Sequence, residues 1–427
     1  MIKKITMMLA LVALMAAPAF ASVQNVKVGG DLATTSILRD GFDFNNGRQN
    51  EIAAQTRLKV SADMTDNVSS TISLTNEKLW GDSTASAVNL EAAYVTMKEL
   101  LYSSLTVTVG RQPLAYGNQL IVGNSSGSAF AQPIGDLLYA TGFDAVKAVL
   151  SYDALTVDVF AARVNNGVPN TVDNNINGTH DNQNLYGINA NYKFGDKMST
   201  VVEGYTFARM NDNVLKSENT YVPGLRVSTN PIEGLNLQLE GAYQFGTINN
   251  ANVLADQMTD RRHAYAIQGG ANYALPVLKD MKPVVGAQYT LLSGNKAENG
   301  PDVHKEGKAW DPMFENQNSG RIFDAVIVNS NRQLSTLSLE VTPINDLTAK
   351  ASWNALWLAQ KQNYVSGSAN SNKYLGSEAD LDLTYAYTED VKFGVSAGYF
   401  ATGKNFLVGS TGNNNASQLL SSVSVAF

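Results

Sequence analysis

Apolar and polar residues alternate with a period of two along most of this chain. In the segment LNLQLEGAYQF, Leu235, Leu237 and Leu239 fall on one side, whereas Asn236 and Gln238 fall on the other. Successive side chains of a β-strand point to opposite faces, so each such segment predicts a strand with one apolar and one polar face. The same alternation occurs in the ranges 52–64, 186–194, 378–389 and 391–400.

The connections between these segments are alternately short and long. Short turns are predicted at 63–67, 152–154, 195–197, 230–234, 343–346 and 388–390, and long polar connections at 118–140, 165–184 and 403–417. A transmembrane barrel with short periplasmic turns and longer outer loops has this alternation, whereas a soluble sandwich with Greek-key connections does not. The pattern therefore favours a barrel whose apolar faces contact lipid and whose polar faces line the lumen.

Counting strands gives about 19 candidates, of which RIFDAVIVN (321–329) is the weakest. Both ends of the chain are expected on the periplasmic side, and that requires an even number of strands. We therefore predict an all-β fold, a transmembrane antiparallel up-and-down β-barrel of about 18 strands, with 16 as the alternative.

The first 21 residues have the pattern of a secretory signal peptide. Lys3 and Lys4 precede an apolar run, and Ala19-Phe20-Ala21 offers small residues at the positions that a signal peptidase reads. The apolar run is shorter than the roughly 20 residues that a spanning helix needs. We expect residues 1–21 to be the signal peptide and residues 22–427 to form the barrel.

The chain ends in SSVSVAF, with Val423, Val425 and Phe427 on one side. The final strand must pair with the first to close a barrel. The terminal aromatic resembles the signature that the outer-membrane assembly machinery recognises, so we expect Phe427 to contact that machinery.

Aromatic residues recur near strand ends on the predicted lipid-facing sides. Such rings favour the boundary between membrane and water. The set is Tyr94, Tyr152, Phe194, Tyr243, Phe245, Trp353, Trp357, Tyr385, Tyr387 and Tyr399.

The composition narrows the possible chemistry. Charged residues make up 16% of the chain, against about 25% in typical soluble domains. There is no cysteine, so disulfides, thiolate nucleophiles and cysteine metal sites are excluded. A formal net charge of -7 argues against a nucleic-acid partner.

Catalytic and metal-binding patterns are weak. The three histidines, His180, His263 and His304, lie in or beside predicted loops, without a Gly-x-Ser-x-Gly turn, so we expect no enzyme. The stretch DNNING (173–178) copies the start of a calcium loop, but position twelve is Asn184 rather than a bidentate acid. We expect a solvated turn there, no metal site and no cofactor.

One stretch carries a more specific likeness. VTVGRQPLAYGNQLIVG (107–123) resembles the alginate-export family of outer-membrane porins, in which a Gly-Arg-Gln strand end is followed by a Tyr-Gly pair. GKAWDPMFENQNSGR (307–321) is similar to a loop segment of that family, and the range 375–400 is similar to its penultimate hairpin. The resemblance implies an 18-stranded monomeric barrel that passes solutes across the outer membrane. Some members export acidic polysaccharide through an arginine-rich lumen, and others are called only porin-like.

Alternation also predicts which charged residues line the pore. Acids and bases nearly balance, whereas a wall that concentrates polyanions needs one sign to dominate. These residues therefore do not establish alginate specificity, and opposite charges on neighbouring strands can simply stiffen the wall. The predicted pore-lining residues are Lys27, Asp31, Arg57, Lys59, Glu91, Lys147, Lys193, Arg226, Glu240, Glu340, Lys350, Asp380 and Asp382.

Arg111 is a separate case. Strict alternation places it with Val107 and Val109 on the lipid side. A bulge near Gly110 would turn it inward. Because of the family likeness we favour the lumen and count Arg111 among the pore-lining residues.

The sequence therefore predicts a porin for passive diffusion of hydrophilic solutes, with anionic solutes such as acidic saccharides among the candidates. A structural or adhesive barrel and, less favoured, a barrel hydrolase are the alternatives. The expected location is the outer membrane of a Gram-negative-type bacterium, in contact with outer-membrane lipid. Loops at Asn118–Ala140 and Ser293–Gln333 are the best candidates to fold inward and narrow the lumen.

Overall fold

The computed structural model describes most of the chain. The described residues are 23–42, 47–83, 86–123, 137, 142–164, 182–212, 218–248, 260–295, 306–361, 373–403 and 415–427. The predicted signal peptide, the stretch 173–178, His180 and His304 lie outside them.

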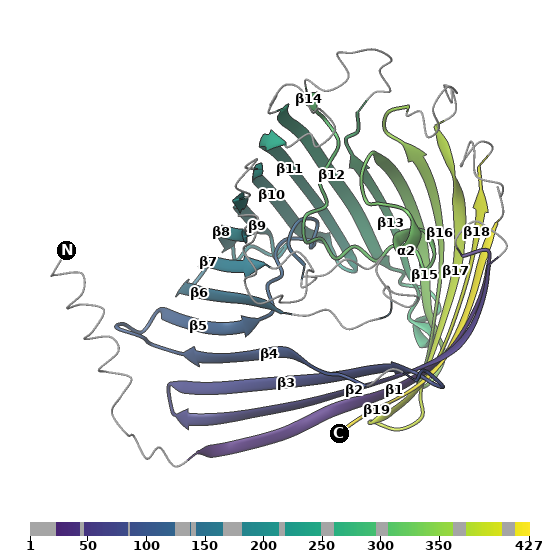
Figure 1. Cartoon of the computed structure of the whole chain (residues 1–427). Coiled ribbons are helices and arrows are strands. Elements are labelled where there is room, and N and C mark those ends of the chain that lie inside the picture. Colours follow the sequence, from purple (N-terminus) through teal and green to yellow (C-terminus); the bar gives the residue numbers. More distant parts are fainter. Residues whose placement is uncertain are drawn as a thin grey trace.

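Eighteen strands in the described part of the chain form one antiparallel sheet that closes on itself (Figure 1). The first and last strands pair from Asp31↔Ala426 to Asp40↔Ser417, which closes the ring. A two-residue strand, β14 (Glu306–Gly307), pairs in parallel with the start of β12, and β13 pairs directly with β15. The predicted up-and-down barrel of 18 strands is confirmed.

Strand lengths suit a membrane crossing, because a tilted spanning strand needs about 9 to 11 residues. The ring consists of β1 (Gln24–Asp40), β2 (Arg48–Thr65), β3 (Val68–Leu79), β4 (Val88–Met97), β5 (Leu105–Gln112), β6 (Phe143–Tyr152), β7 (Leu155–Val164), β8 (Asn182–Lys193), β9 (Val201–Asp212), β10 (Glu218–Ile232), β11 (Leu235–Ile248), β12 (Asp260–Ala274), β13 (Val284–Leu292), β15 (Arg332–Ile344), β16 (Leu347–Leu358), β17 (Tyr374–Ala386), β18 (Val391–Thr402) and β19 (Ala416–Ala426).

Helical structure is minor. The short 3-10 helix η3 (Lys279–Met281) lies in a turn between two strands, and α2 (Phe323–Val326) lies within the range 321–329. That range was the weakest strand candidate, and leaving it out of the count was correct. Among the described residues no helix is long and apolar enough to span a membrane.

The outer face of the barrel is apolar. Leu239, Leu381 and Tyr385 are 57%, 44% and 40% exposed, although a soluble protein would bury such side chains. Their neighbours along each strand, such as Glu240 and Asp380, are buried inside the ring. The apolar sides therefore face outward, and strand closure satisfies the backbone groups as lipid requires.

Most of the aromatic residues predicted to face lipid are on the outer face, but Tyr94 is not. The β3–β4 ladder shifts register between Ser73 and Leu74, because Glu91 is an extra residue in β4. Beyond this bulge Tyr94 pairs with Thr71, which is buried on the inner face. A β-bulge reverses the alternation that follows it, so the prediction for Tyr94 was wrong.

The C-terminal residue continues the ladder that closes the barrel. Gly30 N donates to Phe427 O at 2.9 Å, and Phe427 N donates to Gly30 O at 3.0 Å. A Cβ at Gly30 would lie 2.9 Å from Phe427 Cζ and 2.2 Å from Arg57 O, so this position accepts only glycine. Phe427 remains 61% exposed.

A charge placed on the outer face should destabilise the barrel. We expect Leu381→Arg, near the middle of β17, to lower the free energy of unfolding by about 2 to 4 kcal/mol, because the guanidinium would enter hydrocarbon. Thr384→Arg, on the inner face of the same strand, should change it by less than about 1 kcal/mol, since that side is polar. Denaturant titration in lipid vesicles measures both. Equal losses would contradict the assignment of the two faces.

Candidate functional site in the barrel lumen

Two connecting segments run inside the ring (Figure 1). One follows β5 and is described over residues 113–123, and the other lies between β14 and β15. They bind each other through backbone hydrogen bonds, including Gly123 N to Phe314 O at 2.7 Å and Asn316 N to Gln119 O at 3.0 Å. Both belong to the loops expected to fold inward, but residues 124–136 and 138–141 lie outside the described part.

The two segments cover part of the inner wall with an apolar layer. Tyr116 stacks on Phe160 at a centroid distance of 5.3 Å, and Phe314 meets Phe143 edge-on at 5.5 Å. Burial of such rings is the main apolar stabilisation of the segments. The buried members include Leu114, Tyr116, Leu120, Ile121, Val122, Phe143, Phe160, Leu185, Phe207, Leu292, Trp310 and Phe314.

Buried carboxylates of the wall hold the first segment in place. Glu203 accepts a hydrogen bond from Gly117 N at 3.0 Å. Glu240 accepts hydrogen bonds from Asn118 N at 2.7 Å and from Tyr205 Oη at 2.6 Å. Charged acceptors make the stronger hydrogen bonds in proteins, particularly where water is excluded. The segment is thus attached to the barrel by its backbone.

Asp311 attaches the second segment. Its carboxylate binds Arg209 and, at 3.3 Å, Arg262 Nη2. Gln244 clamps its backbone with hydrogen bonds of 2.7 and 2.9 Å. Burial raises the pKa of Asp311, but the two guanidinium groups lower it by more, so its pKa lies below the ordinary value. Asp311 is therefore ionised at neutral pH and binds both arginines.

Glu378, on β17, anchors the start of α2. It is fully buried and accepts three backbone hydrogen bonds, from Arg321 N at 2.5 Å, Ile322 N at 2.9 Å and Phe323 N at 2.8 Å. These N–H groups have no partner within the helix, since they lie just before it or at its first residue. One wall carboxylate therefore fixes this part of the segment.

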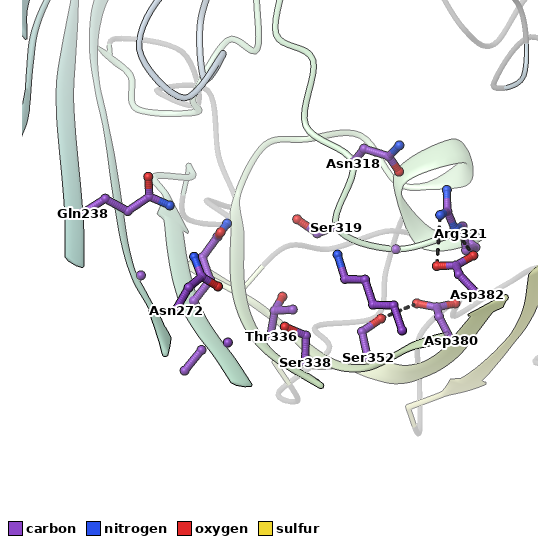
Figure 2. A pocket seen from close by; sticks show the side chains of 16 residues that line it. Gln238, Asn272, Asn318, Ser319, Arg321, Thr336, Ser338, Ser352, Asp380 and Asp382 are labelled. Atoms are coloured by element: carbon purple, nitrogen blue, oxygen red, sulfur yellow. Dashed lines mark hydrogen bonds and ion pairs between the residues drawn. The ribbon is translucent and has the colours of Figure 1, made fainter. Parts of the chain in front are cut away.

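A polar pocket of about 170 Å³ lies between the second segment and the wall (Figure 2). Arg321 binds Asp382 in bidentate fashion, at 3.1 Å from Nε and 3.0 Å from Nη2. Ser352 donates to Asp380 at 3.4 Å. The lining is otherwise rich in amides and hydroxyls and includes Gln238, Asn272, Gln288, Asn318, Ser319, Thr336, Ser338 and Lys350.

This pocket has the chemistry of a site for a hydrated, hydroxyl-bearing solute. Amide and hydroxyl groups can replace the solute's hydrogen bonds to water. Lys350 makes no ion pair with another described residue, so its ammonium is available to an anion. No group of three or more His, Cys, Asp or Glu side chains within the described ranges is arranged to hold a metal ion.

Comparison with known proteins identifies the family. Residues 26–418 match the model of the alginate export family. The chain belongs to this family. No curated protein matches the sequence.

Solved outer-membrane structures have the same barrel. Acinetobacter baumannii OccAB1 superposes with a TM-score of 0.61 at 11% identity, covering 96% of this chain and 99% of that one. Pseudomonas aeruginosa OpdK with vanillate gives 0.57 at 10% identity, covering 94% and 98%. Pseudomonas aeruginosa OccK2 (OpdF) in complex with glucuronate gives 0.56 at 11% identity, covering 95% and 98%. At these identities the likeness concerns the fold, and the protein is a porin-type β-barrel.

The register of this alginate export barrel places the predicted pore-lining residues on its inner face, with one exception. Arg57 binds Asp31 at 3.1 Å and Glu91 at 2.7 Å, and Arg226 lies 3.6 Å from Glu203. The residues on the inner face are Lys27, Asp31, Arg57, Lys59, Glu91, Lys147, Lys193, Arg226, Glu240, Glu340, Lys350, Asp380 and Asp382.

The exception is Arg111, which lies on the outer face. The β5–β6 ladder runs without a register shift, so the alternation that puts Val109 outside also puts Arg111 there. Arg111 binds Asp144 of β6 on that face. Gln112, the next residue, points inward and is 1% exposed. Gly110 has a φ of 120°, but this local conformation does not turn Arg111 inward.

Sequence reasoning missed the anchoring residues of this family member. Glu203 and Glu378 stand at inner-face positions, so alternation could have identified their direction, but their partners are loop backbone atoms. Arg209 and Asp311 are 102 positions apart, and no local pattern links them. Arg321, within the loop Ser293–Gln333 that was expected to fold inward, lines the pocket.

Proposed function

We propose that this barrel lets hydrophilic solutes, small carboxylated saccharides among them, diffuse passively across the outer membrane. The observation that carries the proposal is the polar pocket inside a closed barrel with an apolar exterior. A structural barrel has no need of amides, hydroxyls and an unpaired ammonium facing its interior.

The charges of the wall support a mild preference for anions. Arg57, Arg226 and Arg321 are held in ion pairs with acids of the wall. Lys27, Lys59 and Lys350 make no ion pair with a described residue. Unpaired charges set the local potential in a narrow aqueous path, and the inner-face acid Glu340, which also makes no ion pair with a described residue, opposes these three lysines.

The comparisons agree with such a solute class. The structure of OccK2 is a complex with glucuronate and that of OpdK is with vanillate, and both ligands are carboxylates. The family that matches this chain is named for alginate export. A uronate fits the present pocket, because its hydroxyls can meet the amide side chains and its carboxylate can approach Lys350.

Liposome swelling tests this proposal. Vesicles containing the purified barrel should swell in glucuronate at least as fast as in glucose. Lys350→Gln should lower the ratio of the glucuronate rate to the glucose rate about twofold or more, since one unpaired cation is worth roughly 1 kT of potential. Lys98→Gln, outside the strands, is the matched control. Absence of swelling with correctly folded protein would contradict passive diffusion.

Reversal potentials under a salt gradient test the wall charges separately. Arg57→Ala leaves Asp31 and Glu91 without their shared cation, so selectivity should move toward cations about two- to threefold. Lys59→Ala should move it in the same direction. Arg48→Ala serves as the control and should leave the potential unchanged. Arg48 Nε lies 3.3 Å from Asp40 Oδ1, and both side chains are exposed. If neither inner-face variant shifts the potential, these residues play no part in selectivity.

Three further expectations complete the proposal. Export through a signal peptide cleaved after Ala21 would bring the chain to the periplasm. The exposed Phe427 would there be read by the outer-membrane assembly machinery. The finished barrel would work as a monomer in outer-membrane lipid.

A further inference from the structure

Asn118, in the first inward segment, has all four of its polar groups bound. Its backbone N donates to Glu240 Oε2 and its carbonyl O accepts from Gln317 Nε2, both at 2.7 Å. Its side-chain Nδ2 donates to Gln268 Oε1 at 3.0 Å, and its Oδ1 accepts from Arg226 Nε at 2.6 Å. A loop asparagine more often bonds its own backbone or water. This one residue instead joins three neighbouring strands, β10 to β12, and the second segment.

Asn118, Gln268 and Gln317 close a ring of hydrogen bonds. Gln268 Nε2 donates to Gln317 Oε1 at 2.7 Å, which completes the circuit that begins at Asn118 Nδ2 and returns to Asn118 O. The side chain of Gln268 is buried, since the residue is only 2% exposed, so water competes little for these bonds. The ring therefore ties the wall strand β12 to both inward segments at one point.

The wall side of this contact is held in place by other partners than Asn118. Arg226 Nη1 lies 3.6 Å from Glu203 Oε2. Glu240 accepts a hydrogen bond from Tyr205 Oη at 2.6 Å. Because these wall groups are fixed without the segment, they keep their places when Asn118 leaves, and the contact can open and close again.

The two inward segments are also joined directly to each other. Gly123 N donates to Phe314 O at 2.7 Å. Phe314 N donates to Ile121 O, and Asn316 N donates to Gln119 O, both at 3.0 Å. Ile121 and Phe314 are buried in the same apolar cluster. Neighbouring backbones that share hydrogen bonds and buried apolar contacts tend to open as one cooperative unit.

We propose that Asn118 is a lock that holds residues 116–123 and 310–317 on the wall as one body, and that this body leaves the wall as a unit when the lock opens. Loss of the Asn118 contact breaks bonds to three strands at once, whereas the bonds between the two segments stay intact. Asn318 and Ser319 continue the second segment into the polar pocket, so movement of the body changes the space beside it. That effect on solutes rests on the proposed function, but the lock itself does not.

Hydrogen exchange at single backbone amides of the full-length barrel in lipid nanodiscs tests the lock. The amides of Gly117, Asn118 and Asp311 donate to side chains of the wall, and Asp311 belongs to the second segment. Asn118→Ala keeps all three amides and removes only the side-chain bonds of the lock. We expect the three to exchange about tenfold faster, and by the same factor, because a single opening exposes them together. The amides of Phe314 and Asn316, which bind the first segment, should keep their rates.

Two further variants complete the test. Gln317→Ala breaks the same ring from the second segment and should speed exchange at Gly117 and Asp311 by a similar factor, which also decides the outcome if Asn118→Ala does not fold. Asn236→Ala is the matched control and should change none of these rates. Asn236 is an inner-face amide of β11 that donates to Ser228 at 3.2 Å and to Asn230 at 2.8 Å, both within the wall.

The result separates the possible arrangements of the two segments. Faster exchange in Asn118→Ala at Gly117 without a change at Asp311 would show that the segments open independently. An equal rise at Phe314 would show that they separate from each other, and unchanged rates would show that Asn118 is not the lock. Each of these outcomes, or an equal effect of Asn236→Ala, would overturn the proposal. The measurement needs no current, so it stands apart from the test of the channel.

Discussion

Glu378→Ala should lower the free energy of unfolding by about 3 to 5 kcal/mol and raise the single-channel conductance. The change removes one buried acceptor and leaves three backbone donors without a partner. Each unsatisfied buried donor costs about 1 to 3 kcal/mol, and release of the segment before α2 would widen the lumen. Denaturant titration and planar-bilayer recording measure the two effects.

Glu340→Ala is the matched control for this change. Glu340 is an exposed inner-face acid on β15, and it makes no such bonds to a loop. Its replacement should alter stability by less than about 1 kcal/mol. An equal loss of stability in both variants, or an unchanged conductance for Glu378→Ala, would show that Glu378 does not hold the segment.

Asp311→Ala should have the second largest effect. It removes the shared anion of Arg209 and Arg262, whose side chains are 12% and 8% exposed. Breaking a buried ion pair from one side costs about 3 to 5 kcal/mol. We expect a loss near 3 kcal/mol, because Glu218 still pairs with both arginines, at 3.1 and 3.0 Å. Release of the Trp310–Phe314 turn should also make the open-channel current noisier.

The same anchor should respond to acid. The pKa of Asp311 in the folded barrel lies below its ordinary value of 3.8, so its contribution to stability is present above pH 3.8 and is lost as the pH falls through the lower, folded value. Current noise in the unmodified barrel should therefore rise only below about pH 3.8. Asp311→Ala should be noisy at every pH. Noise that rises instead near neutral pH would contradict this assignment.

The strand pattern could be predicted from the sequence because the barrel has one rule, apolar outside and polar inside. This rule gave the closed barrel, its approximate strand number and the direction of nearly all the charged residues. It was wrong for Tyr94, because a bulge at Glu91 changes the alternation. It was right for Arg111 when applied strictly, and the family likeness led us to the wrong face.

The lumen site was less predictable, because it depends on contacts between distant parts of the chain. Inward-facing side chains are not polar where the two inward segments pack on the wall. Phe160 and Phe207 face inward there and are buried under these segments. The packing of Tyr116 on these two rings explains why aromatic residues occupy inward positions there. Likewise, the wall acids Glu240 and Glu378 serve the loops rather than the solute path, and their partners cannot be read from local spacing.

Stepwise conductance in a planar bilayer tests the central claim most directly. Purified barrel, shown to be folded by its β-sheet circular dichroism, should insert in discrete current steps, and Glu378→Ala should give larger steps. A bilayer that stays silent with folded protein inserted would contradict the claim that the lumen is an aqueous path for solutes.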